Sequence, residues 1–92
     1  MLWFVRENRY ENPLAALCAM DDSERARILW TRAVEEDVSA VQTILAEMTE
    51  TDESWAKIGN PAAVATARIK KMIPGMGKRY GNGNGNGLRG DS

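Results

Sequence analysis

Apolar and polar residues alternate with a helical period over the middle of the chain, from residue 23 to residue 50. Steps of four and three residues place a seam of apolar side chains on one side of a predicted helix: Val34, Val38, Val41, Leu45 and Met48. The strict seam lasts only about two heptads, which favours packing within one chain over an intermolecular coiled coil. We therefore predict one long central helix, which would extend about 42 Å at 1.5 Å per residue. Asp21 and Glu24 resemble a capping box at its start, although Asp22 or Ser23 could cap it as well.

Two shorter helices are predicted from the residues that begin them. Asn12-Pro13 and Asn60-Pro61 each place a capping side chain before a proline, whose missing N–H costs nothing at the first helical position. The first helix should run to about Met20. The second carries apolar residues at steps of three and four, and Pro74 and Gly75 should end it. With the long helix, these two predict an all-α fold, a small three-helix bundle-like domain over residues 1–73.

The N-terminal segment MLWFV is strongly apolar but does not alternate, so the pattern fits a strand or a helical turn equally well. The two short helices, placed end to end, would cover only about three-quarters of the long one. Part of the seam therefore needs other cover, or the long helix must break. The N-terminal segment and a short turn with Trp55 and Ile58 are the natural covers. The alternative for the N-terminal segment is an apolar plug that enters a partner.

From residue 74 to residue 92 the chain reads as an extended, low-complexity arm. Glycine and asparagine alternate over residues 81–87, and glycine loses much backbone entropy on ordering with no apolar side chain to offset the loss. We expect a flexible Gly/Asn-rich arm that orders along a neighbouring molecule. The final RGDS matches a short cell-adhesion tetrapeptide, but four residues are too few to carry an argument.

Composition restricts the chemistry more than it defines it. The chain has no histidine and a single Cys18, which excludes a Ser-His-Asp or Cys-His arrangement, a Cys/His zinc set and an internal disulfide. We expect no enzymatic activity, no cofactor, no metal and no small-molecule substrate. Neither a secretory signal nor a membrane-spanning segment is recognisable, which predicts a location in the cytoplasm or within an assembled particle.

The charge is divided unevenly along the chain, although the net charge is only −1. Residues 21–54 are strongly acidic and residues 55–92 are basic, so the last helix could be tied to the long one, or the basic end could meet an anionic partner. One alternative function is therefore nucleic-acid association through a basic group at this end: Arg68, Lys70, Lys71, Lys78, Arg79 and Tyr80. Another is a small regulator or inhibitor that docks its acidic helix on a partner.

These features together favour a structural or assembly protein, such as a scaffold, an adaptor or a virion-type component. A domain of about 73 residues has a thermodynamically marginal core, so a protein partner or self-association is expected. The predicted partner interface combines the N-terminal segment with the seam of the long helix: Leu2, Trp3, Phe4, Val34, Val38, Val41, Leu45 and Met48.

Overall fold

The computed structural model describes residues 1–76, and every regular element in that part of the chain is an α-helix. The elements are α1 (Leu2–Asn8), α2 (Pro13–Met20), α3 (Glu24–Glu36), α4 (Val38–Met48), α5 (Asp52–Ala56) and α6 (Pro61–Met72). A short helical turn follows at residues 74–76. The all-α prediction is confirmed. Within residues 1–76, none of the helices has the length and apolar character needed to cross a membrane.

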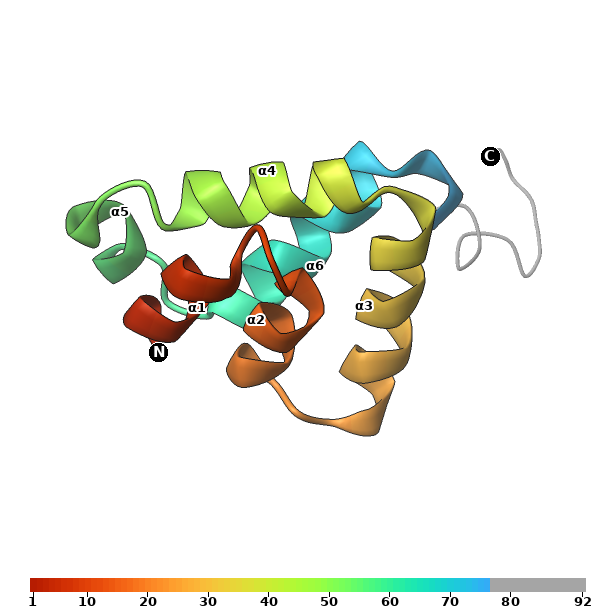
Figure 1. Ribbon diagram of the computed structural model, residues 1–92, viewed down its shortest axis with the longest axis horizontal. Helices are drawn as coiled ribbons and strands as arrows, with labels where there is room; N and C mark the ends of the chain where they lie inside the picture. The colour runs from red at the N-terminus through yellow and green to blue at the C-terminus, as the bar shows by residue number, and fades with distance from the viewer. Residues whose placement is uncertain (77–92) are drawn as a thin grey trace.

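The predicted long central helix is instead two helices, α3 and α4, which run in clearly different directions (Figure 1). Asp37 ends one and begins the other. Its N–H donates to Ala33 O at 2.9 Å, which closes α3, and its carboxylate accepts from Ala40 N at 3.1 Å, which caps α4. The break lets the apolar residues of both halves pack around α2 and α6, which are too short to cover one straight helix. The arrangement is therefore not the simple three-helix bundle that the pattern predicted.

The helix starts predicted from asparagine-proline pairs are confirmed. Asn12 Oδ1 accepts from Ala15 N and Asn60 Oδ1 accepts from Ala63 N, both at 3.2 Å, and a proline occupies the first position of α2 and of α6. Ser23 is the residue that caps α3, through a 3.2 Å bond from Ala26 N to its hydroxyl. These bonds satisfy backbone N–H groups that have no partner within their own helix.

The core lies where α2 meets its neighbours, because α2 packs against α1, α3, α4 and α6. Trp30 of α3 is fully buried there, and its indole N–H donates to Thr66 Oγ1 of α6 at 3.2 Å. This bond satisfies the one polar atom of the largest core side chain. Several further buried residues belong to the same core: Val5, Leu17, Val41, Ile44, Leu45, Met48 and Ile69.

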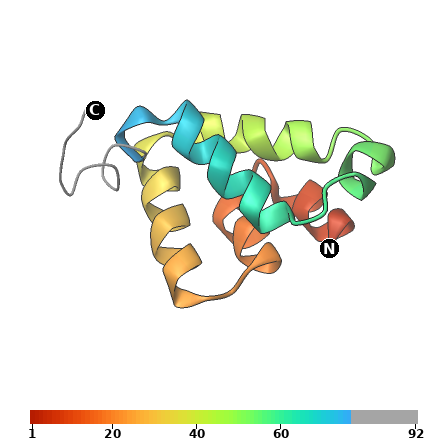
Figure 2. The ribbon, with the colours of Figure 1, turned by 180° about the vertical axis from the view of Figure 1, so that it is seen from behind.

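The folded part continues past residue 73, where the domain boundary was predicted. Ile73 is nearly fully buried and Met76 is completely buried in the same core. Seen from behind in Figure 2, α6 crosses the molecule and the chain then returns to the junction of α3 and α4. There Gly75 lies so close to Glu36 that an added Cβ would come within 3.2 Å of the Glu36 carboxylate. The remainder of the predicted arm, from residue 77 onward, lies outside the described residues.

Candidate functional site

The apolar N-terminal segment forms a helix, α1, that buries only one of its side chains. Val5 is completely covered and belongs to the core, whereas the Trp3 side chain is 70% exposed and Phe4 is 37% exposed. Leu2 is half-buried. A tryptophan with so large an exposed fraction marks a contact surface when other exposed apolar side chains lie beside it.

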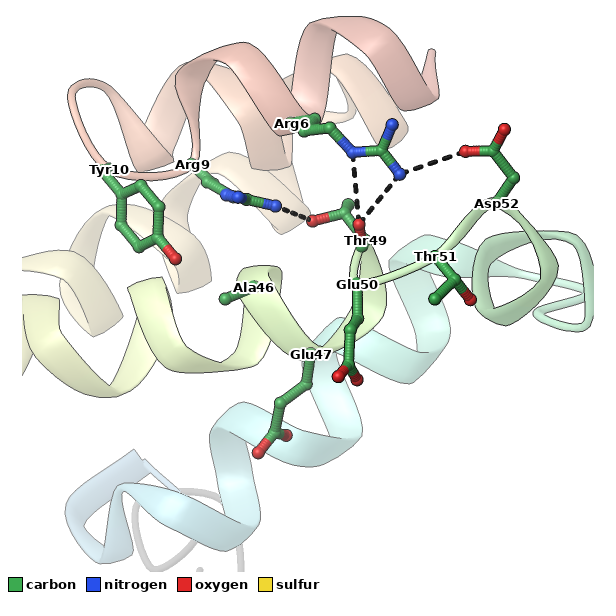
Figure 3. Close-up of a pocket in the computed structure, with 9 residues that line it drawn as sticks. All are labelled: Arg6, Arg9, Tyr10, Ala46, Glu47, Thr49, Glu50, Thr51 and Asp52. Carbon is green, nitrogen blue, oxygen red and sulfur yellow. Dashed lines mark hydrogen bonds and ion pairs between the residues drawn. The ribbon is translucent and has the colours of Figure 1, made fainter.

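Arg6 fixes α1 to the C-terminal end of α4. Its Nε and Nη2 atoms donate to the carbonyl oxygen of Thr49, at 3.2 and 3.0 Å, and Nη2 also lies 3.2 Å from Asp52 Oδ1 at the start of α5 (Figure 3). The last carbonyl groups of a helix have no partner within the helix and carry the negative end of its dipole. The Arg6 guanidinium supplies both the missing donors and the matching charge.

Arg9 contacts the same end of α4, but it bonds to the Thr49 side chain and not to the Thr49 carbonyl group. Its Nη1 donates to Thr49 Oγ1 at 2.8 Å, and that hydroxyl in turn donates to Leu45 O at 2.8 Å. Thr49 is completely buried, so these bonds satisfy a hydroxyl that would otherwise be costly to bury. Arg6 and Arg9 are three residues apart and so lie on one face of α1. Both therefore hold that face against the end of α4.

Tyr10 follows α1 and is held from two sides. The Arg9 guanidinium lies over its ring, 4.9 Å from the centroid, and the Tyr10 carbonyl accepts a 2.7 Å hydrogen bond from Gln42 Nε2 of α4. The side chain nevertheless stays 54% exposed. We call the exposed side of this region the α1 surface; it comprises Met1, Trp3, Phe4 and Tyr10, with the exposed carboxylates of Glu7 and Glu11.

A hollow of about 860 Å³ lies between α1 and the turn that joins α4 to α5. The two arginines and Tyr10 line it from one side, and Glu47, Glu50 and Asp52 line it from the other (Figure 3). An anion that entered would meet three carboxylates, and the arginines already donate to Thr49. We therefore interpret the hollow as the joint that fixes α1 rather than as an anion-binding site.

The structure places the predicted seam residues mainly inside the molecule. Val41, Leu45 and Met48 are buried in the core, where their own chain already covers them, and Val34 packs partly buried against the same core. A partner could reach the buried three only if the domain opened, so they are not part of the α1 surface. Val38 is 41% exposed, but it lies at the break between α3 and α4.

The described basic residues of the predicted anion site do not form a cluster with open donors. Arg68 Nη1 lies 3.7 Å from Glu47 Oε1, so it ties α6 to α4, as the charge pattern allowed. Lys70 and Lys71 are exposed in the last turn of α6, where positive charge also complements the helix dipole. Lys78, Arg79 and Tyr80 lie outside the described residues.

Arg6, Arg9 and Tyr10 were not predicted as site residues, although the sequence holds one signal for the two arginines. Two arginines three residues apart, directly after an apolar run, indicate a helix with one basic face. What that face contacts could not be read from the sequence, because Thr49 and Asp52 lie 40 or more residues further along the chain.

Replacing Arg6 with alanine should lower the free energy of unfolding by about 1–2 kcal/mol, because the Thr49 carbonyl would lose two charge-assisted bonds. The value lies at the lower end of the usual range because the Arg6 side chain is 39% exposed. Asp52→Ala is the matched control, since it removes only an ion pair on the surface and should change stability by less than about 0.5 kcal/mol. Urea unfolding followed by circular dichroism measures both. Equal losses from the two substitutions would contradict the role given to the carbonyl bonds.

Comparisons of the chain with protein-family models, with curated proteins and with solved structures found no match.

Proposed function

We propose that this chain is a non-enzymatic interaction protein that binds a protein partner through the α1 surface. The observation that carries the proposal is the contrast within one short helix: Val5 is fully buried, while Trp3, two residues earlier, is 70% exposed. Arg6 and Arg9 hold α1 in place from the other side. Trp3 and Phe4 are thus presented on a helix whose position is fixed.

The energy available at this surface is large for so small a protein. Burying about 150 Å² of an indole ring contributes up to roughly 4 kcal/mol at 25 cal/mol per Å². Phe4 and Tyr10 add to this. Aromatic side chains on a pre-positioned element lose little entropy on binding, which is why tryptophan and tyrosine dominate the energetics of protein interfaces.

The chemistry of the α1 surface restricts its partner. The exposed Glu7 and Glu11 are the charged side chains on its outer side, because the guanidinium groups of Arg6 and Arg9 are turned toward Thr49 (Figure 3). We infer a partner with an apolar pocket for the indole ring and with lysine or arginine at its rim. Complementary rim charge of this kind increases the association rate and excludes wrong partners.

A role in a larger assembly, as a scaffold, an adaptor or a virion-type component, remains part of this proposal. The predicted contact of the C-terminal arm with a neighbour falls on residues outside the described part of the chain. The two alternative functions, nucleic-acid association and docking of an acidic helix, have no comparable support, because Arg68 is engaged by Glu47 and the apolar seam of α4 is in the core.

Site-specific photo-crosslinking in the protein's native cells tests the proposal. The photoreactive amino acid p-benzoylphenylalanine in place of Phe4 should give one discrete adduct, which mass spectrometry can identify and which purified protein can then reproduce. The same amino acid in place of Ile28 is the matched control, because Ile28 is also apolar and 53% exposed but lies on α3, away from the α1 surface.

The adduct at position 4 should disappear when Trp3 is replaced by serine. No adduct at position 4, or the same adduct from positions 4 and 28, would overturn the proposal. An adduct that is nucleic acid rather than protein would instead support the first alternative.

A further inference from the structure

The junction between α3 and α4 consists of a single residue, Asp37, and nothing in its sequence forbids a straight helix. Residues 33–41 contain neither glycine nor proline. The apolar seam also keeps its helical period across the junction, since Val34, Val38 and Val41 follow at steps of four and three. One continuous helix over 24–48 would be about 37 Å long and locally consistent with the sequence.

One side-chain hydrogen bond is specific to the broken form. The Asp37 carboxylate accepts from Ala40 N at 3.1 Å, and this bond exists only where a new helix begins. A straight helix would instead pair the N–H groups of residues 38–40 with the carbonyl groups four residues before them. Asp37 is exposed and its φ of −158° lies outside the left-handed region, so neither burial nor a strained φ requires the break locally.

The remaining contacts that hold the break join the two halves of the molecule, residues 1–36 and residues 38–76. They include the Trp30–Thr66 hydrogen bond, the bonds of Arg6 and Arg9 to Thr49, and the bond of Gln42 to Tyr10. All of them can form equally well between two chains if the halves are exchanged. Exchange of identical elements is a low-cost route to a dimer when the connecting segment is this short.

From these observations we infer that a second copy of this chain is a binding partner, and that the dimer forms by exchange of residues 1–36 across a straightened α3–α4 helix. The monomer dominates at low concentration, because its two halves are already joined. The fraction of dimer rises as the protein concentration increases. It does not use the α1 surface, so this inference is independent of the proposed function.

The same chain shows how the straight form could be blocked. Before Pro13 and Pro61, Asn12 and Asn60 have ψ angles of 68° and 92°, and Asp37 before Val38 has a ψ of 86°. A proline therefore fits at position 38 in the broken form, where it takes the first position of a helix. In a straight helix the same proline would lose the bond to residue 34 and clash with its carbonyl.

Substitution of Asp37 in the full-length chain tests the inference by sedimentation equilibrium. Asp37→Leu removes the cap and places a good helix former in each of the two straightened α3–α4 helices of the dimer. The dissociation constant of this variant dimer should be on the order of 100-fold lower than that of the wild-type dimer. Asp37→Ala should lower the dissociation constant by a similar factor, because alanine also cannot cap a helix and has the highest helix propensity. Asp37→Asn, the matched control, keeps the capping oxygen and should stay within about threefold of the wild type. Val38→Pro should form no dimer.

A second measurement separates exchange from ordinary surface association. In a mixed dimer of isotope-labelled and unlabelled Asp37→Leu chains, nuclear Overhauser effects between Trp30 and Thr66 should appear between chains, because that 3.2 Å contact joins the two halves. Dimers without this interchain contact would overturn the inference. So would Asp37→Leu and Asp37→Ala chains that both remain monomeric or both unfold.

Discussion

Replacing Trp30 with alanine should leave the domain largely unfolded at 25 °C. Trp30 is the largest fully buried side chain, and truncations of this size in a core cost about 3–5 kcal/mol. A helical domain of this length has a free energy of unfolding of about 5 kcal/mol or less. The unfolding should be visible as a much weaker helical signal in the circular dichroism spectrum and as a non-cooperative thermal transition.

Two further variants complete this test: one removes only the hydrogen bond of Trp30, and the other truncates an exposed side chain on the same helix. Thr66→Val keeps the volume near position 66 but leaves the indole N–H without its acceptor, which should cost about 1–2 kcal/mol. Ile28→Ala, on the same helix but half exposed, should change stability by less than about 1 kcal/mol. If Trp30→Ala were as stable as Ile28→Ala, the placement of α3 against α6 would be wrong.

Replacing Trp3 with alanine should have the opposite profile, a large loss of binding with little loss of stability. Affinity for the protein identified by crosslinking should fall at least about 30-fold, because truncating a central interface tryptophan costs about 2 kcal/mol or more. The side chain is 70% exposed in the free chain, so the melting temperature should shift by no more than about 4 °C. Titration calorimetry and thermal unfolding measure the two quantities.

Ile28→Ala again serves as the control, this time for binding, because it removes exposed apolar surface on a different helix, α3. It should leave the affinity unchanged within about twofold. An equal loss of affinity in Trp3→Ala and Ile28→Ala would indicate general adhesion of apolar surface and not recognition by α1.

The helix starts could be predicted from the sequence because their causes are local. Asn12-Pro13 and Asn60-Pro61 combine a capping side chain with a fixed φ within two residues, and both begin helices. At Asp37 the neighbouring residues supply a cap for a new helix, but nothing in the local sequence forces the helix to break. A straight helix is equally consistent with residues 33–41, so the break depends on how α2 and α6 are covered, which is a property of the whole fold.

The candidate site was predictable only in part, for the same reason. The composition of MLWFV indicated an apolar segment, and Trp3 and Phe4 were predicted from it as partner-interface residues; the structure leaves both exposed, and their contact with a partner stays a prediction. Apolar character alone cannot distinguish Val5, which is buried, from Trp3, which is exposed. That difference arises because Arg6 and Arg9 set the rotation of α1 by bonding to Thr49, a contact between residues far apart in the sequence.

Hydrogen–deuterium exchange, measured on the free chain and on its complex with the crosslinked protein, locates the segment of the chain that binds the partner. We expect new protection in peptides that cover residues 1–11, with unchanged exchange in peptides from the N-terminal half of α3. Protection confined to α3 or α6, with residues 1–11 exchanging as in the free chain, would contradict the assignment of α1 as the binding surface.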